Sequence, residues 1–342
     1  MATYKEVNGT AVQNNAGDYT GAVEGQVWYN STAASFQFRS VAATGSWASA
    51  TALPTAFKTG GYSGTATAGL IFAGSNGPSR VNTTYEYDGS SWTSGGNMNT
   101  SKNYITGCGI QTATLAFGGE GGASGCYGTT YGSCTTEQYN GSSWTSTTNA
   151  PYDGGATNMA GTSTSAITAG DGRGTPAATL QGLLFNSGSW TAAPNMNTGA
   201  PAYRSQCGIL GTSSSSAIFV GGDNGTGANF IANVEQWNGS SWTEITDLNT
   251  GRGDLGGAGS VTAGLVFGGK TGPSSYTGTT ELWNGSSWSE QGDLSSNRGN
   301  SSGNRGTSLA TWAAGGESPG AVTTVEEWTG AGATITETIT TS

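Results

Sequence analysis

The sequence predicts an all-β fold in which a four-stranded antiparallel repeat occurs six times. Short strings with an aromatic residue at each end recur at regular intervals, and an apolar run that ends in small residues precedes each string. No stretch carries apolar residues at helical spacing, and the 60 glycines among 342 residues would penalise helices. Aromatic residues make up 10% of the chain, which predicts a packed core because disordered chains are poor in them.

The most regular element is the six-residue aromatic string. Clear copies occupy residues 87–92, 139–144, 185–190, 237–242 and 283–288, and a degenerate copy occupies 328–333. The second aromatic residues, with Trp47 in front, are spaced 45, 52, 46, 52 and 46 residues apart through Trp288, and Ala333 follows after 45. The central pair, for example Asn140-Gly141, predicts a hairpin turn between a third and a fourth strand, with positive φ at both residues.

The apolar runs predict the second strand of each repeat. They occupy residues 70–74, 115–119, 167–170, 218–222, 265–269 and 312–316. In the fifth repeat we expect strands near 255–261, 263–269, 279–284 and 286–293. Four antiparallel strands in every 45–52 residues, six times over, are the signature of a β-propeller.

The repeats resemble Kelch repeats, in which a basic residue opens the inner strand, Gly-Gly closes the second strand, and aromatic residues mark the third and fourth. This resemblance implies a six-bladed Kelch-type β-propeller, with four antiparallel strands per blade, over residues 51–342. The preceding residues 1–50 are expected to form an N-terminal extended arm and a hairpin.

A covariation within the chain predicts internal ion pairs. Four repeats combine a basic residue at the start of the inner strand with a glutamate two positions before the strand-three aromatic residue. The expected pairs are Lys102 with Glu137, Arg204 with Glu235, Arg252 with Glu281, and Arg298 with Glu326. The third repeat has Leu183 at the glutamate position, whereas the first has Tyr85 there but keeps Lys58. Solvated, independent charges are the alternative to buried pairs.

The loops between the second and third strands all emerge on one face of the expected ring and differ in length and sequence. Such variation over a uniform scaffold is typical of a recognition surface, and drift in unselected loops is the alternative. The candidate ligand-binding residues there are Tyr127, Tyr131, Asp223, Asn224 and Tyr276, because aromatic faces suit the apolar side of sugar rings. Cys126 and Cys134 lie in one of these loops, and the sequence leaves open whether they form a disulfide.

Residues 1–50 do not share the repeat. A hairpin is expected over residues 26–30 and 35–39, and Trp28, Tyr29, Phe36 and Phe38 are its candidate docking residues. The string Gly25-Gln26-Val27-Trp28-Tyr29-Asn30-Ser31-Thr32 resembles the N-terminal attachment segments of tail-fibre and other virion proteins of marine bacteriophages. That resemblance implies a virion structural protein whose arm joins other virion proteins, with host-surface carbohydrate as the expected ligand of the propeller.

Composition narrows the classes of function. A net charge of −10 and a pI near 4.4 argue against nucleic-acid binding, which needs clustered basic residues. The chain has no histidine, which removes histidine-based catalysis and histidine-ligated metals, and we expect no cofactor or metal. No segment predicts membrane insertion or a signal peptide, so the expected location is the virion, assembled in the host cytoplasm.

The sequence favours a non-enzymatic role. A glycosidase needs two carboxylates in one cleft, and the 21 acidic residues are spread thinly. Asp171, Asp223 and Glu317 nevertheless follow second strands on the loop face, so a glycan-active propeller enzyme remains an alternative. A purely architectural decoration protein and an intracellular Kelch adaptor for protein–protein interaction are the other two.

Overall fold

The computed structural model describes residues 12–339, with gaps at 20–21, 24, 42–43, 122–131, 156, 171–181, 198–206, 224–229, 301–302, 304–305 and 333. The chain divides into two units: the smaller contains residues 1–45 and 329–342, and the larger contains residues 46–328. The regular elements of the described residues are all β-strands. Within the described ranges, no helix is long and apolar enough to cross a membrane.

The described part of the larger unit contains five four-stranded antiparallel sheets, each formed by strands from one stretch of chain. The first sheet comprises β5 (Gly61–Thr65), β6 (Ala68–Phe72), β7 (Thr84–Tyr87) and β8 (Trp92–Ser94). The second comprises β9 (Asn103–Ile110), β10 (Ala113–Glu120), β11 (Thr136–Tyr139) and β12 (Trp144–Thr147). The third comprises β13 (Asn158–Gly161), β14 (Ser165–Ala169), β15 (Gly182–Asn186) and β16 (Ser189–Ala193).

The fourth and fifth sheets follow the same plan. The fourth comprises β17 (Gly208–Ser213), β18 (Ser216–Val220), β19 (Val234–Trp237) and β20 (Trp242–Ile245). The fifth comprises β21 (Gly256–Gly259), β22 (Gly264–Phe267), β25 (Thr280–Trp283) and β26 (Trp288–Glu290). Between β22 and β25, the strands β23 (Lys270–Gly272) and β24 (Ser275–Tyr276) form a separate hairpin.

The sixth sheet combines strands from the C-terminal end of the larger unit with one strand from its N-terminal end. It contains β27 (Ala310–Ala314), β28 (Val325–Thr329) and β4 (Ser46–Ser49), which adds to the edge of β28. Trp47 of β4 packs edge-on against Phe267 of the fifth sheet, with ring centroids 4.9 Å apart. Two expectations are therefore wrong: residues 46–49 belong to the ring rather than to an arm, and the degenerate string at 328–333 does not join a third to a fourth strand of the sixth sheet, because β4 occupies the fourth position. The edge of β28 needs a partner, and the N-terminal segment provides it.

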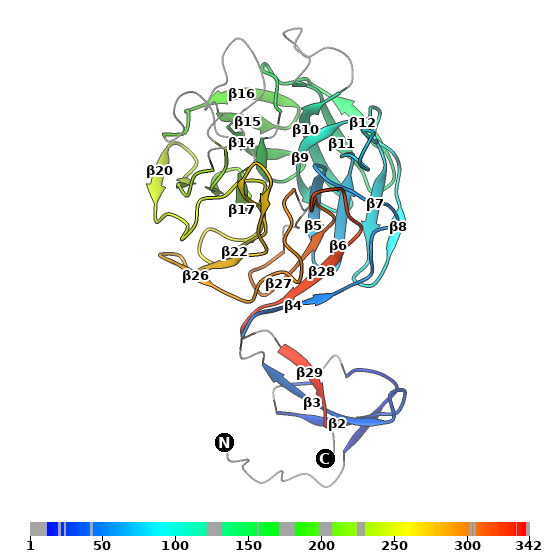
Figure 1. Cartoon of the computed structure of the whole chain (residues 1–342). Helices are drawn as coiled ribbons and strands as arrows, with labels where there is room; N and C mark the ends of the chain where they lie inside the picture. The colour runs from blue at the N-terminus through cyan, green and yellow to red at the C-terminus, as the bar shows by residue number, and fades with distance from the viewer. Residues whose placement is uncertain are drawn as a thin grey trace. The chain divides into compact units, whose positions relative to one another are not determined.

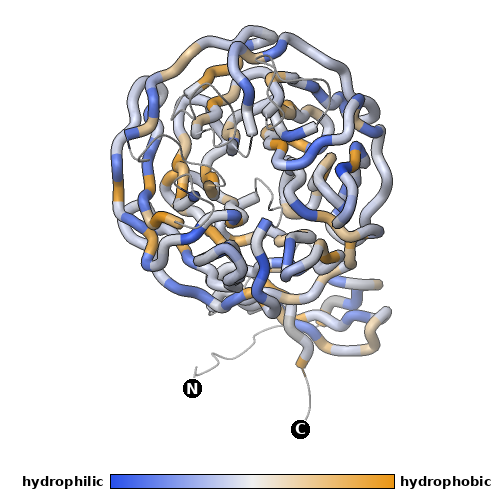
Figure 2. Tube along the Cα trace, turned by 45° about the horizontal axis from the view of Figure 1, so that its top comes forward, coloured by the Kyte–Doolittle hydropathy of each residue, from blue (hydrophilic) through white to orange (hydrophobic). Residues whose placement is uncertain are grey.

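The sheets of the larger unit form a closed ring around an axis (Figure 1). The first strands of consecutive sheets, β5, β9, β13, β17 and β21, are neighbours in that order. The ring closes between the sixth and first sheets, where the rings of Trp312 in β27 and Trp92 in β8 lie 5.5 Å apart. Hydrophobic segments are distributed around the ring rather than gathered in one layer (Figure 2).

Aromatic residues of the repeat pack between neighbouring sheets. Trp144 of the second sheet contacts Phe72 of the first, and Trp190 of the third contacts Phe117 of the second, at centroid distances of 4.7 and 4.8 Å. The indole N–H of Trp144 donates to Oγ1 of Thr84 at 2.9 Å, which satisfies its polar atom inside the core. Burying each such ring contributes roughly 1.5–3 kcal/mol, so these contacts hold adjacent sheets together.

Four of the five turns that join a third to a fourth strand are longer than the sequence predicted. Tyr139 pairs with Trp144, which leaves a loop of four residues. The side-chain Oδ1 of Asn140 accepts the N–H groups of Ser142 and Ser143 at 3.0 and 2.9 Å. In this four-residue turn positive φ is confined to the glycine, 92° at Gly141, because the asparagine side chain rather than its backbone closes the turn. In the third sheet Asn186 pairs with Ser189, which leaves a two-residue turn with positive φ at both Ser187 (43°) and Gly188 (95°), as predicted.

The smaller unit is a four-stranded sheet built from both ends of the chain. Its order is β1 (Gln13–Asn15), β2 (Val27–Asn30), β3 (Ser35–Val41) and β29 (Thr334–Thr338), with β1 parallel to β2 and the other pairs antiparallel. Trp28 is fully buried, with the Arg39 guanidinium 5.8 Å from its ring centroid. The β2–β3 hairpin occurs near its expected position, but β1 and β29 flank it where a free arm was expected.

Candidate binding site

A pocket that is partly open to solvent lies where the first strands of the sheets begin. Residues from all six sheets line it, from Thr59 in the first to Asn300 in the sixth, so it lies on the ring axis. Its polar lining residues are Thr59, Tyr62, Tyr104, Thr157, Asn158, Asp254 and Asn300. We call this cavity the axial pocket.

Four polar residues of the axial pocket have left-handed backbone conformations although none is glycine. Their φ angles are 56° at Thr59, 52° at Tyr104, 57° at Asp254 and 53° at Asn300. This conformation costs an L-residue roughly 1–2 kcal/mol, and it is least common for β-branched residues such as threonine. Strained backbone of this kind clusters at binding and active sites.

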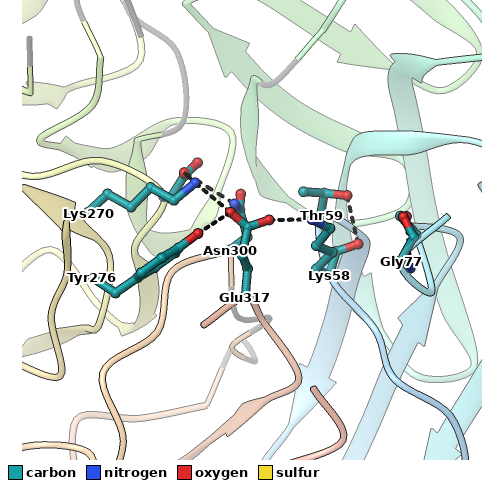
Figure 3. A network of polar contacts seen from close by, with 9 residues as sticks. Lys58, Thr59, Gly77, Lys270, Tyr276, Asn300 and Glu317 are labelled. Atoms are coloured by element: carbon teal, nitrogen blue, oxygen red, sulfur yellow. Dashed lines mark hydrogen bonds and ion pairs between the residues drawn. The ribbon is translucent and has the colours of Figure 1, made fainter. Parts of the chain in front are cut away.

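A charged network lies beside the axial pocket, centred on the Glu317 carboxylate (Figure 3). Oε1 of Glu317 accepts hydrogen bonds from Lys270 Nζ at 2.8 Å and from the Tyr276 hydroxyl at 2.6 Å. The ammonium group of Lys58 contacts the other carboxylate oxygen. Lys58 precedes the first sheet, Lys270 and Tyr276 belong to the β23–β24 hairpin, and Glu317 follows β27, so three sheets contribute to what we call the Glu317 network.

The Glu317 network connects directly to the axial pocket. Oδ2 of Asp254 accepts a salt bridge from Lys270 Nζ at 3.2 Å and a hydrogen bond from Asn300 Nδ2 at 3.2 Å. Lys270 therefore contacts both carboxylates, which places a cation between Asp254 at the pocket and Glu317 outside it. Its Nζ also lies 5.1 Å from the centroid of the Tyr276 ring.

Three groups of the Glu317 network, the Glu317 carboxylate, the Tyr276 phenol and the Lys270 ammonium, keep one protonation state at neutral pH. Burial alone would raise the pKa of the Glu317 carboxyl, but hydrogen bonds from Lys270, Lys58 and Tyr276 outweigh it and lower the pKa to about 2. Burial and the hydrogen bond to Glu317 raise the pKa of Tyr276 to about 12. For Lys270, burial is outweighed by Asp254 and Glu317, which raise its pKa above the usual range. Such a carboxylate is a poor proton donor, because a general acid needs a pKa near the working pH.

The residues predicted to bind ligand are only partly brought together. Tyr276 is half-buried in the Glu317 network. Asp223 is 5% exposed, and its backbone pairs with Phe230. Tyr127, Tyr131 and Asn224 lie outside the described residues, as does the acidic candidate Asp171. The sequence analysis missed the lining residues Thr59, Tyr104, Asp254 and Asn300.

The structure brings two of the predicted ion pairs into direct contact in the core. Arg252 NH2 lies 3.0 Å from Oε1 of Glu281, and both side chains are fully buried. Arg298 and Glu326 form the equivalent contact one sheet further on. In each pair the second carboxylate oxygen accepts a backbone N–H from the segment that joins one sheet to the next. The N–H of Asn249, between β20 and β21, donates to Glu281 at 3.0 Å, and the N–H of Ser295, between β26 and β27, donates to Glu326 at 2.8 Å.

The other two expected pairs differ. The Lys102 ammonium donates to Oγ1 of Thr135, and burial lowers the pKa of Lys102 to about 8 against the opposing attraction of Glu137. Oε2 of Glu137 accepts the backbone N–H of Asn99 at 3.0 Å. Arg204 lies outside the described residues, while Oε2 of its expected partner Glu235 accepts the N–H of Asn197 at 2.7 Å.

The hydrogen-bond register of the first sheet shows that Lys58 was assigned to the wrong position of the repeat. The carbonyl of Phe57 accepts the N–H of Gly316 at 2.7 Å, as that of Arg298 accepts the N–H of Gly269 at 2.9 Å. Phe57, not Lys58, therefore occupies the opening position, and it shares a core cluster with Tyr85. An aromatic pair replaces the ion pair in this sheet, and Lys58 is free to reach Glu317.

The cysteines divide into two groups. Cys108 and Cys207 are buried thiols, and Cys108 Sγ donates to the carbonyl of Thr162 at 3.3 Å. Cys134 is disulfide-bonded, whereas its expected partner Cys126 lies outside the described residues, so that pairing stays a prediction. Within the described residues, no group of three or more Asp, Glu or Cys side chains could hold a metal ion.

Comparison with known proteins bears on the fold. No protein-family model and no curated protein sequence matches the chain. The solved structure of YjhT, which has a β-propeller-like fold, matches with a TM-score of 0.65 and covers 81% of this chain and 96% of its own. The larger unit is a β-propeller. At 16% identity the likeness extends to the fold alone, so the function of the propeller has to be argued from its own residues.

Proposed function

We propose that this chain is a non-enzymatic bacteriophage virion structural protein. In this proposal the smaller unit docks to other virion proteins and the propeller is displayed outward to bind host-surface carbohydrate. The observation that carries the binding role is the axial pocket, whose lining combines hydroxyl, phenol and amide groups with two tyrosine rings. That combination suits sugars, which present hydroxyl groups at their edges and apolar C–H faces.

We also propose that the propeller is six-bladed and of the Kelch type, with each of the six sheets as one blade. Arg252 and Arg298 open inner strands, Gly-Gly pairs such as Gly268-Gly269 follow second strands, and tryptophans occupy the fourth strands. These placements support the resemblance that the sequence suggested. Trp47 supplies the fourth-strand aromatic residue of the sixth blade.

The docking role rests on one face of the smaller sheet. Tyr29 of β2 pairs with Phe36 of β3, their rings lie 5.2 Å apart, and Phe38 follows on the same face. Phe36 is 47% exposed, and Ile339, whose N–H donates to the Phe36 carbonyl, is 44% exposed. Exposed apolar groups gathered on one face are typical of protein-contact sites. Trp28, expected to dock, is buried and stabilises the sheet instead.

The absence of hydrolysis is part of the proposal. Inverting and retaining glycosidases both need one carboxyl that carries a proton and a second carboxylate facing it. Glu317 has a pKa of about 2 and contacts two lysines, and Asp254 forms a salt bridge with Lys270. These two carboxylates therefore favour a site that holds a ligand without cleaving it.

The test uses the full chain on an array of bacterial surface glycans. Saturable binding to a subset of glycans, with no reducing sugar released on prolonged incubation, is the expected result. Binding to no glycan would overturn the adhesive role and leave architectural decoration. Release of sugar would overturn the non-enzymatic assignment.

Docking is tested separately by following the protein into particles. Phage carrying Phe36→Asp should incorporate the chain several-fold less, because a charge would be buried in the contact. Ser35→Asp is the matched control, because Ser35 directly precedes Phe36 and its side chain lies on the opposite face of β3. Equal incorporation of wild type and Phe36→Asp would exclude this face as the docking surface.

A further inference from the structure

The left-handed residues of the axial pocket form a continuous backbone belt. The N–H of Asn300 donates to the Asp254 carbonyl at 2.8 Å, and the N–H of Thr59 donates to the Asn300 carbonyl at 3.5 Å. The N–H of Tyr104 then donates to the Thr59 carbonyl at 2.7 Å. The belt therefore runs through the fifth, sixth, first and second sheets and fixes the pocket rim before any ligand arrives. Such preorganisation reduces the ordering cost of binding.

Glycine would form this belt without strain. A left-handed backbone position is met most cheaply by glycine, and the ring uses glycine at many such positions, for example Gly74 and Gly269. Of the seven non-glycine residues with positive φ in the described part of the chain, four lie in the belt and line the axial pocket. Their side chains are thus held at an energetic cost that the belt itself does not require, which points to a role for the side chains.

The side chains of the belt define the ligand chemistry. Together they offer a hydroxyl, a phenol, a carboxylate and an amide, which can both donate and accept hydrogen bonds. Lys270 neutralises Asp254 from outside the pocket, so the lining presents neither an uncompensated anion nor an uncompensated cation. An uncharged ligand rich in hydroxyl groups is the best match, because a charged ligand would lose its hydration without gaining a counter-charge.

The position of the pocket defines how a ligand enters. Every sheet of the ring contributes to the lining, so walls surround the cavity on all sides and approach is possible along the axis. A polymer that lies across the face would have to bend sharply to place an internal residue in the pocket. The end of a glycan chain meets no such obstacle.

We propose that the axial pocket recognises the uncharged terminal monosaccharide of a glycan, positioned by Thr59, Tyr104, Asp254 and Asn300. This inference rests on the proposed carbohydrate-binding function and assigns the site and the part of the glycan that it reads. The belt holds the four side chains, and Tyr62 and Tyr104 are the aromatic residues of the lining.

The first arm of the test uses variants of the full chain and a glycan that binds on the array. Asn300→Gly should weaken binding by at least about ten-fold, since a hydrogen-bonding group is lost. Its melting temperature should stay equal or rise, because glycine relieves the left-handed strain. Tyr104→Asn should weaken binding similarly, since asparagine tolerates the backbone conformation but lacks the ring. Ser187→Gly, with a φ of 43° in a turn of the third sheet outside the pocket, is the matched control and should bind as wild type.

The second arm compares each bound glycan with the same glycan lacking its terminal residue, and adds the free terminal monosaccharide as competitor. Loss of binding with the shortened glycan and competition by the monosaccharide are expected. Wild-type binding by Asn300→Gly and Tyr104→Asn would overturn the axial site while carbohydrate binding itself stands. Equal binding of shortened glycans would overturn end recognition, and an array without any signal would instead refute the proposed function.

Discussion

Two charged networks of the propeller begin two residues apart and have opposite characters. Arg252 points into the core, where it forms a fully buried pair with Glu281 that Arg298 and Glu326 repeat one sheet further on. Asp254 points to the axis, where it joins Lys270 in the partly exposed Glu317 network. The first network lies within single sheets and recurs, whereas the second joins three sheets and occurs once among the residues that the structure describes. In this repeat protein, ion pairs that recur within single sheets therefore belong to the scaffold, and charges that converge from several sheets mark a site.

The buried pair should show the largest effect. Glu281→Gln is expected to destabilise the protein by about 3–5 kcal/mol, because it leaves the Arg252 guanidinium buried without a counter-charge. Urea unfolding at pH 7 measures the loss. A cost below about 1 kcal/mol would mean that the pair is not desolvated and would remove the contrast with the Glu317 network.

The chain supplies a matched control for this pair. The first sheet has Phe57 and Tyr85 at the positions of Arg252 and Glu281. The double variant Arg252→Phe, Glu281→Tyr copies that aromatic pair and should recover most of the stability that Glu281→Gln loses, since apolar replacements of buried pairs are often neutral. A double variant as unstable as the single one would show that the fifth sheet depends on charge in a way the first does not.

The scaffold could be predicted from the sequence because its residues repeat. Basic residues at the position of Arg252 recur 16 or 17 residues before Gly-Gly, and glutamates at the position of Glu281 recur two residues before an aromatic string, so the covariation identified both without coordinates. The same reasoning erred by one position at Lys58, since nothing local distinguishes its register from that of Phe57. Closure of the sixth sheet by β4 was missed for a related reason: pairing between strands about 280 residues apart leaves no local pattern.

The site was largely beyond the sequence. Lys270 and Glu317 each follow a Gly-Gly pair but carry opposite charges, Lys58 follows the opening residue of its sheet, and only closure of the ring brings the three together. The left-handed backbone at Thr59 and Tyr104 is invisible as well, because neither residue type signals positive φ. The sequence does indicate part of the site. Asp254 and Asn300 each lie two residues after a strand-opening arginine, and aspartate and asparagine tolerate the left-handed conformation.

Lys102 tests whether all scaffold charges behave like Arg252. Burial lowers its pKa to about 8 from the usual value of 10.5, so the folded state binds this proton less tightly than the unfolded state. Stability should therefore rise with pH between about 8 and 10.5, by roughly 2–3 kcal/mol from this residue. Urea unfolding of wild type and Lys102→Met across pH 7–10 isolates the effect. If the unfolding free energies of the two proteins changed in parallel with pH, Lys102 would be solvated, and the scaffold charges would not all be desolvated.

Glu317 should give the smallest stability effect and the opposite dependence on pH. Its pKa of about 2 lies below the usual 4.5, so the network stabilises the fold above pH 4.5, and this contribution disappears as pH falls from 4.5 toward 2. Because the side chains are partly exposed, we expect about 1–2 kcal/mol at pH 6 rather than the full value of the shift. Unfolding of Glu317→Gln should therefore differ from wild type at pH 6 and converge with it near pH 2.

The exposed Glu290 of the fifth sheet provides the control, since Glu290→Gln removes a carboxylate without a network and should follow wild type throughout this range. A Glu317→Gln deficit that persists unchanged at pH 2 would mean that the side chain acts through packing. The Glu317 network would then be a second scaffold element, and recurrence would no longer separate scaffold charges from site charges in this propeller.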